Sequence, residues 1–403
     1  MRYRNRALLR RSVRRNTPMR IALVYRSFQL TGSQARRTVE LARHLSRRHD
    51  VHVFSIGSRT DISLAPRCAF HDVRVGHLGD GVRFSARELV TFGFRAARLV
   101  EPSAFDVVHA CNPSTWIGDV LHLPGVARGE ALLQGSGRVH LMADNLRHPG
   151  NAARWLIERR ALKSGSLRRI HVDAPSVVSD LWRYHEIPAD RILVVPPAVN
   201  LVEFRPVEDA VAARASISVR DPARTVLLFC GSDFERKGLD RAIEALAATD
   251  VDAELLVVGS SDQEARFRAL ARHRRVEDRV RFLGTRKDPA RYYQAADILV
   301  LPTRADVWGV TPIEAMASGI PSIVSDAAGS AVVVREAGAG IVLPEPLDVR
   351  DLREAVEHLA RHPELRREMA RKGLAAVAAH SWESRGKLVE DDLRALVEGR
   401  VGA

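Results

Sequence analysis

The sequence lacks long apolar runs and is poor in cysteine and aromatic residues. No run approaches the roughly 18–20 apolar residues that a membrane-spanning helix needs, so an integral membrane protein is not expected. The only cysteines are Cys68, Cys111 and Cys230, and they are scattered along the chain. This spacing argues against a disulfide framework or a zinc cluster and fits a reducing compartment, so we expect a cytoplasmic protein.

Several ligand-binding signatures are also missing. The segment TGSQAR (31–36) follows the first expected strand and contains one glycine, whereas a dinucleotide fingerprint needs G-x-G-x-x-G. A nicotinamide or flavin enzyme is therefore not favoured. The chain contains no G-x-x-x-x-G-K-[ST], no H-E-x-x-H and no G-x-S-x-G, which argues against a P-loop NTPase, a zincin and an α/β-hydrolase.

Positive charge is concentrated in the first half of the chain. The whole sequence has 62 basic and 49 acidic residues, a net charge of +13. Residues 1–200 have a net charge of +16 and residues 201–403 a net charge of −3, counted from the sequence. This asymmetry indicates that one half meets an anionic partner, either a nucleic acid or a phospholipid surface, or that the basic residues form a solubilising surface.

The order of apolar segments predicts two α/β domains after a basic, disordered arm at residues 1–18. Expected strands of the first domain are 19–25, 51–56, 72–78, 105–110, 119–123, 168–174 and 192–200, with helices at 35–48, 85–100, 153–162 and 175–185 and loops at 128–150. Expected strands of the second domain are 225–231, 253–259, 280–284, 298–302 and 321–325. Strands that alternate with helices predict two Rossmann-like, doubly wound parallel sheets that face a central cleft, with domain limits at 19–198 and 199–383.

The stretch DVWGVTPIEAMASGIP (306–321) contains a helix start. Pro312 suits the first helical position, which would put Thr311 at the N-cap and Glu314 at the third helical position. The pattern T-x-x-E is typical of a capping box, in which each side chain satisfies a backbone donor of the other. The capping box by itself explains Thr311 and Glu314 without any ligand.

A ligand site explains the rest of this stretch. Asp306 and Gly309 follow the expected strand 298–302, and ligands of open α/β sheets bind outside the carboxyl ends of strands. A loop that leads into a helix N-terminus offers free N–H groups to a phosphate. Two carboxylates beside such a site, Asp306 and Glu314, would accept hydrogen bonds from the hydroxyl groups of a sugar and a ribose.

The stretch GSDFERKGLDRAIEAL (231–246) forms a second loop between a strand and a helix. Arg236 and Lys237 precede the helix, although cations are unfavourable at a helix N-terminus. A bound anion would explain the pair, and so would a solvated arrangement with Asp233 and Glu235 nearby. If the two loops face each other, one supplies cations for a diphosphate and the other supplies carboxylates for sugars, which predicts a nucleotide-sugar site.

These residues resemble the retaining glycosyltransferases of family 4, which have the GT-B fold. The resemblance covers about residues 19–398 and is strongest over 226–345, in GSDFERKGLDRAIEAL, VRFLGTRKD, YYQAADILVLPT and DVWGVTPIEAMASGIPSIVSDAAG. Within the family, the chain is similar to the enzymes that add glucose to the lipopolysaccharide inner core. The resemblance implies hexose transfer, with retention, from a UDP-sugar or another nucleoside diphosphate sugar. It also implies an acceptor-binding first domain, against which a C-terminal helix at about 384–398 packs, and a donor-binding second domain.

The resemblance also assigns roles to residues. Asp306 stands where the family has the first glutamate of its E-x7-E pair, next to the transferred sugar, and Glu314 matches the second, which holds the ribose. The catalytic residues implied are Asp306, His122 and Lys237, although His122 also fits a histidine that ends a buried strand. The donor-binding residues implied are Gly32, Ser33, Gly231, Arg236, Lys237, Arg286, Trp308, Gly309, Val310, Thr311 and Glu314.

The family uses no metal and no cofactor, because Lys237, Arg236 and a helix dipole can neutralise the leaving diphosphate. Asp250 and Asp252 spell D-x-D, the metal motif of another glycosyltransferase fold, but they precede strand 253–259 at the end opposite the ligand. We interpret them as part of a solvated loop and expect no metal site.

Partners follow from the charge asymmetry and the resemblance. We expect a nucleotide-sugar donor, a glycan or glycolipid acceptor, and contact of the basic half with the anionic inner face of the cytoplasmic membrane. A sugar-nucleotide epimerase of the same fold is an alternative, but the sequence offers no acid/base pair for it. A nucleic-acid-binding protein is a further alternative, for which the sequence has no recognition motif and an aromatic content of only 5%.

Overall fold

The computed structural model describes residues 17–28, 33–57, 67–75, 85–127, 149–219, 221 and 223–399. The chain divides into two compact units. Unit 1 comprises the chain up to Pro196 and from Trp382 onward, and unit 2 comprises Pro197–Ser381. Both boundaries lie two residues before those expected from the sequence.

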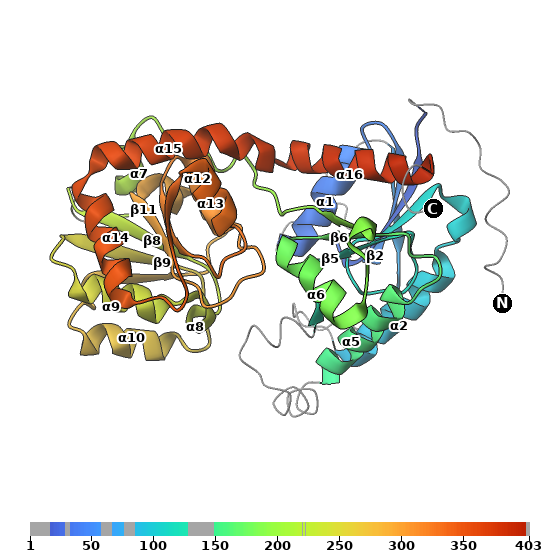
Figure 1. Cartoon of the computed structure of the whole chain (residues 1–403), viewed down its shortest axis with the longest axis horizontal. Coiled ribbons are helices and arrows are strands. Elements are labelled where there is room, and N and C mark those ends of the chain that lie inside the picture. The colour runs from blue at the N-terminus through green and yellow to red at the C-terminus, as the bar shows by residue number, and fades with distance from the viewer. Residues whose placement is uncertain are drawn as a thin grey trace. The chain divides into compact units, whose positions relative to one another are not determined.

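Unit 1 is built on a parallel sheet with the strand order β3-β2-β1-β4-β5-β6-β7 (Figure 1). Its strands are β1 Arg20–Ser27, β2 Asp50–Ile56, β3 Cys68–Asp72, β4 Val107–Ala110, β5 Val120–Leu123, β6 Arg169–Val172 and β7 Ile192–Val194. All six neighbouring pairs are parallel. Parallel strands are covered by helices on both faces, which explains why β4 and β5 are buried along their whole length.

The helices of unit 1 come from both ends of the chain. They are α1 Ser33–Leu45, α2 Ala86–Leu99, α5 Pro149–Leu162, α6 Pro175–His185 and α16 Trp382–Val397, with the short 3₁₀ helices η1 Pro102–Ala104 and η2 Ala189–Arg191. A capping box starts α2, in which Ser85 and Glu88 satisfy each other's backbone donors. The C-terminal helix α16 packs against α1, as the expected helix 384–398 required.

Unit 2 repeats this architecture with the strand order β10-β9-β8-β11-β12-β13. Its strands are β8 Thr225–Cys230, β9 Ala253–Val258, β10 Val280–Gly284, β11 Ile298–Leu301, β12 Ser322–Ser325 and β13 Gly340–Leu343. Its helices are α7 Ala210–Ser216, α8 Phe234–Lys237, α9 Leu239–Ala248, α10 Glu264–His273, α11 Ala290–Ala295, α12 Thr311–Ser318, α13 Ala331–Ala337, α14 Val349–Arg361 and α15 Pro363–Val377, followed by the 3₁₀ helix η3 Ala378–His380.

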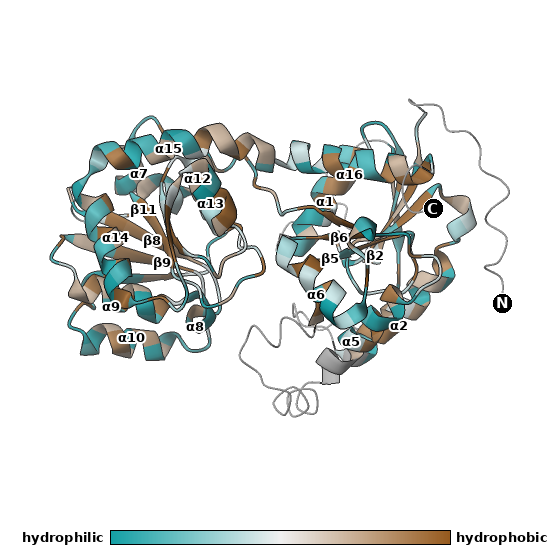
Figure 2. Ribbon diagram, in the orientation of Figure 1, coloured by the Kyte–Doolittle hydropathy of each residue, from teal (hydrophilic) through white to brown (hydrophobic). Residues whose placement is uncertain are grey.

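The unit 2 sheet separates two apolar cores. On β8, Val226 and Leu228 face the core beneath α11, α12 and α13, whereas Leu227 and Phe229 face the core beneath α9, α10 and α14. Successive strand residues point to opposite faces, so a short, wholly apolar strand fills both cores. Figure 2 shows the consequence, with strands β8, β9 and β11 largely hydrophobic and hydrophilic residues along the helices.

In unit 2, β9 and β10 follow β8 on one side, whereas β11, β12 and β13 extend on the other side. The direction of winding therefore reverses between β8 and β11. The loops that leave the carboxyl ends of these two neighbouring strands diverge there, and such a point is where doubly wound sheets bind ligands. The fold thus brings together the two stretches that the sequence singled out.

Some expectations about single elements were wrong. The third strand is Cys68–Asp72 and not 72–78, because Cys68 pairs with Val51 at the start of β2. Strand β13 and helix α7 were missed, since both are short. Residues 1–16 and 128–148, where a basic arm and loops were expected, lie outside the described residues. No helix in the described part of the chain is long and apolar enough to cross a membrane.

Candidate functional site

The candidate site of unit 2 is built on the loops that follow β8 and β11. After β8 the chain passes through Gly231 into the short helix α8, which ends in Arg236 and Lys237. Gly238, with φ +78°, then starts α9, and a Cβ there would lie 2.0 Å from the carbonyl oxygen of Pro302. Only glycine allows this close approach, which holds the cationic loop against the chain that leaves β11.

Lys237 and Asp306 form the centre of the site. The ammonium of Lys237 pairs with Oδ2 of Asp306, and Nη1 of Arg236 lies 3.8 Å from Oδ1 of the same carboxylate. Arg236 also donates from Nε to Asp233 (2.7 Å) and from Nη1 to the carbonyl of Ala305 (2.7 Å). Lys237 is 8% exposed. Its charge is therefore largely shielded from water and is held by the Asp306 carboxylate, with which an entering anion would compete.

The backbone at Gly309 fits closely around Asp306. Gly309 has φ +77°, and a Cβ there would lie 2.7 Å from Oδ2 of Asp306. The loop is fixed from behind, because Asp306 forms a bridge with Ala328 and the N–H of Gly329 donates to the carbonyl of Asp306 at 3.0 Å. Gly309, which a capping box does not explain, therefore makes room for a carboxylate of the chain itself.

The capping box expected at Thr311 is wrong. Helix α12 begins at Thr311 with Val310 as its N-cap, and no side chain caps it. The hydroxyl of Thr311 is buried without a hydrogen-bond partner among the described residues. Among the described residues, no group accepts a hydrogen bond from the backbone N–H of Trp308, Gly309 or Val310. Three consecutive backbone donors thus remain available at the positive end of the helix.

Glu314 turns toward helix α11 instead of toward Thr311. Its Oε2 accepts a hydrogen bond of 2.7 Å from the hydroxyl of Tyr293. Cys230, at the end of β8, lies close to both, and burial together with the Glu314 carboxylate raises the pKa of the Cys230 thiol to about 12. The charge of Lys237 lowers the pKa of the same thiol. Glu314, Tyr293, Cys230 and Lys237 therefore surround one point at the carboxyl end of β8.

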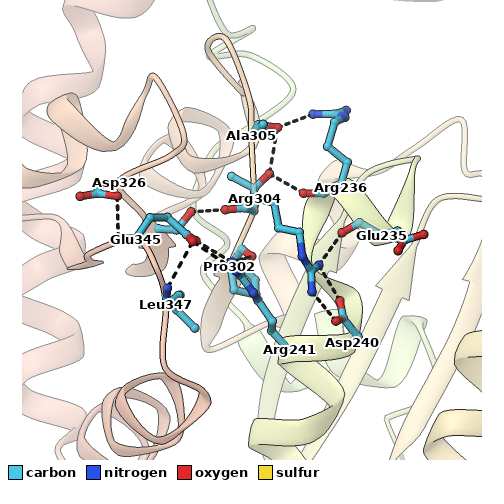
Figure 3. Close-up of polar contacts among 12 residues, drawn as sticks. Glu235, Arg236, Asp240, Arg241, Pro302, Arg304, Ala305, Asp326, Glu345 and Leu347 are labelled. Atoms are coloured by element: carbon cyan, nitrogen blue, oxygen red, sulfur yellow. Dashed lines mark hydrogen bonds and ion pairs between the residues drawn. The ribbon is translucent and has the colours of Figure 1, made fainter. Parts of the chain in front are cut away.

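A second network of charges supports the two loops from outside (Figure 3). Arg304 holds the carboxylate of Asp240 with hydrogen bonds of 2.8 and 2.5 Å and donates to the carbonyl of Glu235 at 2.6 Å. Arg241 holds Glu345 in the same two-pronged way at 2.5 and 3.1 Å and donates to the carbonyl of Pro302 at 3.2 Å. Bidentate pairs of this kind fix orientation as well as distance.

Sequence reasoning missed this network and Tyr293. The two arginines that define the network lie in a helix and a loop whose ordinary composition gives no signal of pairing across 64 and 104 residues of chain. Tyr293 belongs to the YYQAADILVLPT stretch that carried the family resemblance, so its neighbourhood was noticed although the residue was not.

Three predicted donor-binding residues are not joined to this cluster. Arg286 follows the edge strand β10, is exposed and has no hydrogen bond or ion pair with another described residue. Ser33 is the first residue of α1, in unit 1. Gly32 lies outside the described residues. The role of each stays a prediction.

His122 lies in unit 1, on β5, and is 2% exposed. Its Nε2 is 2.8 Å from Oδ1 of Asp173 and 2.6 Å from Nη1 of Arg37. Burial and the Arg37 charge lower the pKa of His122 to about 3. In this structure the imidazole is enclosed by protein, as the alternative of a histidine in a buried strand required, and its catalytic role stays a prediction.

Asp250 and Asp252 both lie in the exposed turn before β9, at the opposite end of the sheet from Lys237. Asp250 pairs with Arg361, and Asp252 pairs with Arg224 at 2.8 Å. These two carboxylates are therefore satisfied by arginines of unit 2.

The unit 2 site combines two side-chain cations, a row of free backbone donors and two carboxylates at a switch point of the sheet. The cations and backbone donors suit a diphosphate, and the carboxylates suit hydroxyl groups. Such a constellation on a doubly wound domain, in a chain with a second domain of the same kind, defines the GT-B class of glycosyltransferases.

Comparison with known families agrees with this class. Residues 34–203 match the model of "Glycosyltransferase Family 4", and residues 215–375 match that of "Glycosyl transferases group 1". The first match falls largely in unit 1 and the second lies in unit 2. The chain therefore belongs to the family 4 glycosyltransferases with the GT-B fold.

Individual relatives cover part of the chain. The lipopolysaccharide glucosyltransferase WaaG of Escherichia coli is 27% identical over 244 residues, which are 59% of this chain and 64% of that protein. The D-inositol 3-phosphate glycosyltransferase of Segniliparus rotundus is 31% identical over 228 residues, 54% of this chain and 50% of that protein. The chain thus spans about half to less than two thirds of the length of these curated relatives.

Solved structures extend the likeness of fold. A crystal structure of WaaG covers 93% of this chain and 99% of its own, with a TM-score of 0.75 and 22% identity. Anabaena HepE in complex with UDP and glucose covers 94% of this chain and 100% of its own, with a TM-score of 0.70 and 15% identity. At these identities the likeness establishes the fold.

Proposed function

We propose that this protein transfers a hexose, with retention of anomeric configuration, from a nucleoside diphosphate sugar to a hydroxyl group of a glycan or lipid-linked acceptor. Unit 2 holds the donor and unit 1 the acceptor. The observation that carries the proposal is the convergence of Lys237, Arg236 and the free N–H groups of Trp308–Val310 on one point. WaaG, described as a lipopolysaccharide glucosyltransferase, and HepE, seen with UDP and glucose, support the choice of donor class.

The residues of the site divide the work between the diphosphate and the sugars. The diphosphate replaces Asp306 as the partner of the Lys237 ammonium. It also accepts hydrogen bonds from the backbone N–H groups at the start of α12. Asp306, released from that pair, accepts hydroxyl hydrogens of the transferred sugar. Glu314, held by Tyr293, accepts those of the ribose. Asp306 is one methylene shorter than the glutamate usual in the family, so its reach contributes to the choice of sugar.

Charge neutralisation in this site needs no metal ion. As the bond from the anomeric carbon to the diphosphate breaks, negative charge grows on the leaving oxygen, and Lys237 with the α12 dipole stabilises it. The acceptor oxygen bonds to the anomeric carbon from the same face of the sugar, and the leaving phosphate oxygen takes the proton of the acceptor hydroxyl. Retention follows without an enzymic nucleophile, and Asp306 acts on the hydroxyl groups of the sugar instead.

A panel of nucleotide sugars tests the donor proposal. The purified full chain is titrated by calorimetry with UDP-, ADP-, GDP- and dTDP-hexoses, and release of nucleoside diphosphate is followed by chromatography. We expect one nucleotide class to bind and to be hydrolysed or transferred slowly. Glu314→Gln should weaken its binding at least about 10-fold, since the ribose loses a charged acceptor. Glu336→Gln, exposed on α13, is the matched control.

Two results would reject the donor proposal. One is that no nucleotide sugar binds at millimolar concentration. The other is that Glu314→Gln binds as tightly as the parent protein. Epimerised donor in the absence of any acceptor would favour the epimerase instead.

A basic and apolar patch on unit 1 supports a membrane-bound acceptor. Phe94 of α2 and Leu156 of α5 are each 57% exposed, and the ring of Trp116 lies between them, 4.8 Å from that of Phe94. A shallow hollow of about 560 Å³ is lined by Trp116, Leu156, Arg159, Arg160, Lys163 and Ser164. We name these residues and Phe94 the α2–α5 patch.

The patch has the composition of a membrane-binding surface. The guanidinium of Arg160 stacks over Trp116 at 4.9 Å, so apolar and cationic groups are interleaved and not segregated. Aromatic and aliphatic side chains of this kind enter the headgroup region, while each Lys or Arg near an anionic surface contributes about 1 kcal/mol. The proposal is therefore that unit 1 meets its acceptor at an anionic bilayer.

Vesicle sedimentation tests the membrane proposal. The full chain should bind vesicles that contain phosphatidylglycerol and leave phosphatidylcholine vesicles in the supernatant, with binding weakened by salt. Arg159→Glu combined with Lys163→Glu should weaken binding at least about 10-fold. Arg371→Glu, an exposed position in unit 2, should not. Equal binding by all three proteins would reject the patch but leave the donor site untouched.

A further inference from the structure

Three buried histidines lie side by side on the unit 1 sheet. His109, His122 and His171 belong to β4, β5 and β6, which are neighbouring strands. His122 pairs directly with His171, and His109 pairs with Val120, two residues before His122. Because residues two apart share a face of a strand, all three imidazoles project from the same face. Each is at most 2% exposed.

The spacing of the three rings resembles that of histidines that bind a metal ion. One nitrogen of each ring lies within 4.8 Å of one nitrogen of the other two, and this is the group of potential metal ligands found among the described residues. The ring centroids of His109 and His171 are 5.2 Å apart, and His122 lies 6.4 and 6.3 Å from them, with interplanar angles of 59–84°. Zinc–nitrogen bonds of about 2.0–2.1 Å in a tetrahedron place such centroids about 5 Å apart. The His109–His171 spacing fits this value, and His122 must move closer to the other two rings to complete the set.

Some ring nitrogens of the three histidines are buried without a hydrogen-bond partner among the described residues. Neither ring nitrogen of His109, nor Nδ1 of His171, has a partner in the part of the chain that the structure describes. Buried imidazole nitrogens without partners are costly, because the ring cannot be hydrated.

Two of the rings are already oriented by carboxylates. Nε2 of His122 lies 2.8 Å from Asp173, and Nε2 of His171 lies 2.8 Å from Asp392 of α16. A histidine that binds a metal through one ring nitrogen typically holds a carboxylate with the other, which fixes its tautomer and orientation. On His171 this leaves Nδ1 for an ion. Nε2 of His122 also lies 2.6 Å from Nη1 of Arg37, so its Nδ1 is left for an ion when Nε2 donates to Asp173 and not when Nε2 accepts from Arg37.

We propose that His109, His122 and His171 form a binding site for one divalent transition-metal ion of the zinc class, with Asp173 and Asp392 as the outer carboxylates. The ion links three adjacent strands and, through Asp392, the C-terminal helix α16. It is a structural site inside unit 1 and is remote in sequence from the donor-binding loops.

The charges around the cluster set the expected strength. The two outer carboxylates already have cationic partners: Arg37 forms hydrogen bonds of 2.6 and 2.9 Å with Asp173, and Arg169 forms a salt bridge of 2.7 Å with Asp392. Arg385 of α16 is 5% exposed, and its charge acts on all three rings. These arginines oppose a dication, so the site should bind more weakly than thiolate zinc sites, whose ligands carry negative charge.

Metal content tests the proposal. Because the cluster is enclosed, the full chain is produced in cells supplied with Zn²⁺ or Co²⁺, passed over a chelating resin and analysed by mass spectrometry. We expect about one ion per chain, and for Co²⁺ the intense visible absorption of a four- or five-coordinate ion. His109→Leu removes a ligand without breaking a described hydrogen bond, and it should reduce the retained metal at least about 10-fold.

The control is His71→Gln. His71 forms a histidine pair with His52 outside the cluster, at 2.8 Å, so it measures adventitious binding by other histidines. Less than about a tenth of an ion per chain in the parent protein, or equal metal in the parent and in His109→Leu, would overturn the proposal. If His109→Leu does not fold, the ion count and the cobalt spectrum of the parent protein decide.

Discussion

The two units of this chain have the same strand topology and use their polar residues in opposite ways. In both sheets the strand order reverses at one point, between β1 and β4 in unit 1 and between β8 and β11 in unit 2. In unit 2 the charged groups of the site lie on the loops and short helices that follow the strand ends, where Asp306 and Glu314 remain partly exposed. In unit 1 the imidazoles stand on the strands themselves, beneath α16.

The comparison teaches that topology alone does not locate chemistry. The face of the unit 1 sheet that carries His109, His122 and His171 receives a helix from the far end of the chain, and that helix supplies Asp392 and Arg385. The carboxylates on this face are paired and buried, and so are the histidines His122 and His171 that they hold. In unit 2, the backbone N–H groups of Trp308–Val310 have no acceptor among the described residues.

The same difference explains part of the charge asymmetry. Several of the basic residues that give residues 1–200 their net charge of +16 are paired inside unit 1, as Arg37 is with Asp173 and Arg169 with Asp392. The remaining positive surface includes the α2–α5 patch. Net charge counted from a sequence therefore overstates the charge that a partner meets.

A substitution in the donor site of unit 2 should have the greatest effect. Lys237→Ala should lower kcat/KM for the nucleotide sugar by about 10³-fold, because the leaving diphosphate loses its buried cation. Thermal stability should change little, since Asp306 gains hydration when its partner is removed. Steady-state kinetics on the best donor of the panel measures this, with Lys287→Ala, an exposed lysine after β10, as control. Equal losses in both variants would contradict a specific role.

A corresponding substitution in the buried charge network of unit 1 should lower stability and leave donor binding unchanged. Asp173→Asn leaves Arg37 buried without its charge partner and should lower the free energy of unfolding by about 3–5 kcal/mol. Denaturant unfolding followed by hydrogen exchange should locate the loss in unit 1. Asp288→Asn breaks an exposed pair with Arg291 and should cost less than about 1 kcal/mol. A donor Kd that changes with Asp173→Asn would show that the two units are energetically coupled.

Gly309 and Gly284 separate backbone strain from side-chain crowding. Both have a positive φ, +77° and +70°, but a Cβ on Gly309 meets Asp306 whereas a Cβ on Gly284 meets nothing within 4 Å. Alanine at either position should cost about 1–2 kcal/mol of stability. Only Gly309→Ala should also lower kcat, by about 10²-fold, because it displaces the carboxylate. Kinetics and thermal unfolding of both variants measure the difference, and equal kcat values would remove Asp306 from the site.

The smallest expected effect concerns the buried support of Glu314. Tyr293→Phe removes one hydrogen bond to the carboxylate and should weaken binding of the nucleoside diphosphate about 10-fold, while kcat at saturating donor stays within about 2-fold. Tyr292→Phe, the neighbouring buried tyrosine on α11, is the matched control. Calorimetry with UDP measures both, and unchanged binding by Tyr293→Phe would mean that Glu314 does not hold the ribose.

Much of the fold could be predicted because strand and helix periodicity is local. The buried strands at 225–230 and 298–301 stand within one residue of their predictions. The start of α12 also lies one residue from its prediction, but its capping could not be predicted. T-x-x-E indicated a cap at Thr311, but the tertiary contact between Tyr293 and Glu314 outcompetes the local bond.

The donor-site candidates were found because glycine, charge and strand ends coincide in two short stretches. Residues around the site that pair with a distant part of the chain, such as Arg241 with Glu345, were not predicted. Pairing across the fold leaves no periodic or compositional trace in either segment.

Apolar periodicity and glycine positions act over a few residues, so the two parallel sheets, a division near residue 198 and the two loops at the switch point could be predicted from the sequence. Tertiary structure decided where Glu314 points, that His122 is enclosed, and that three histidines from separate strands share one face. Those outcomes depend on which helix covers which strand. A helix such as α16, more than 200 residues away from β6, enters that arrangement only when the chain is folded.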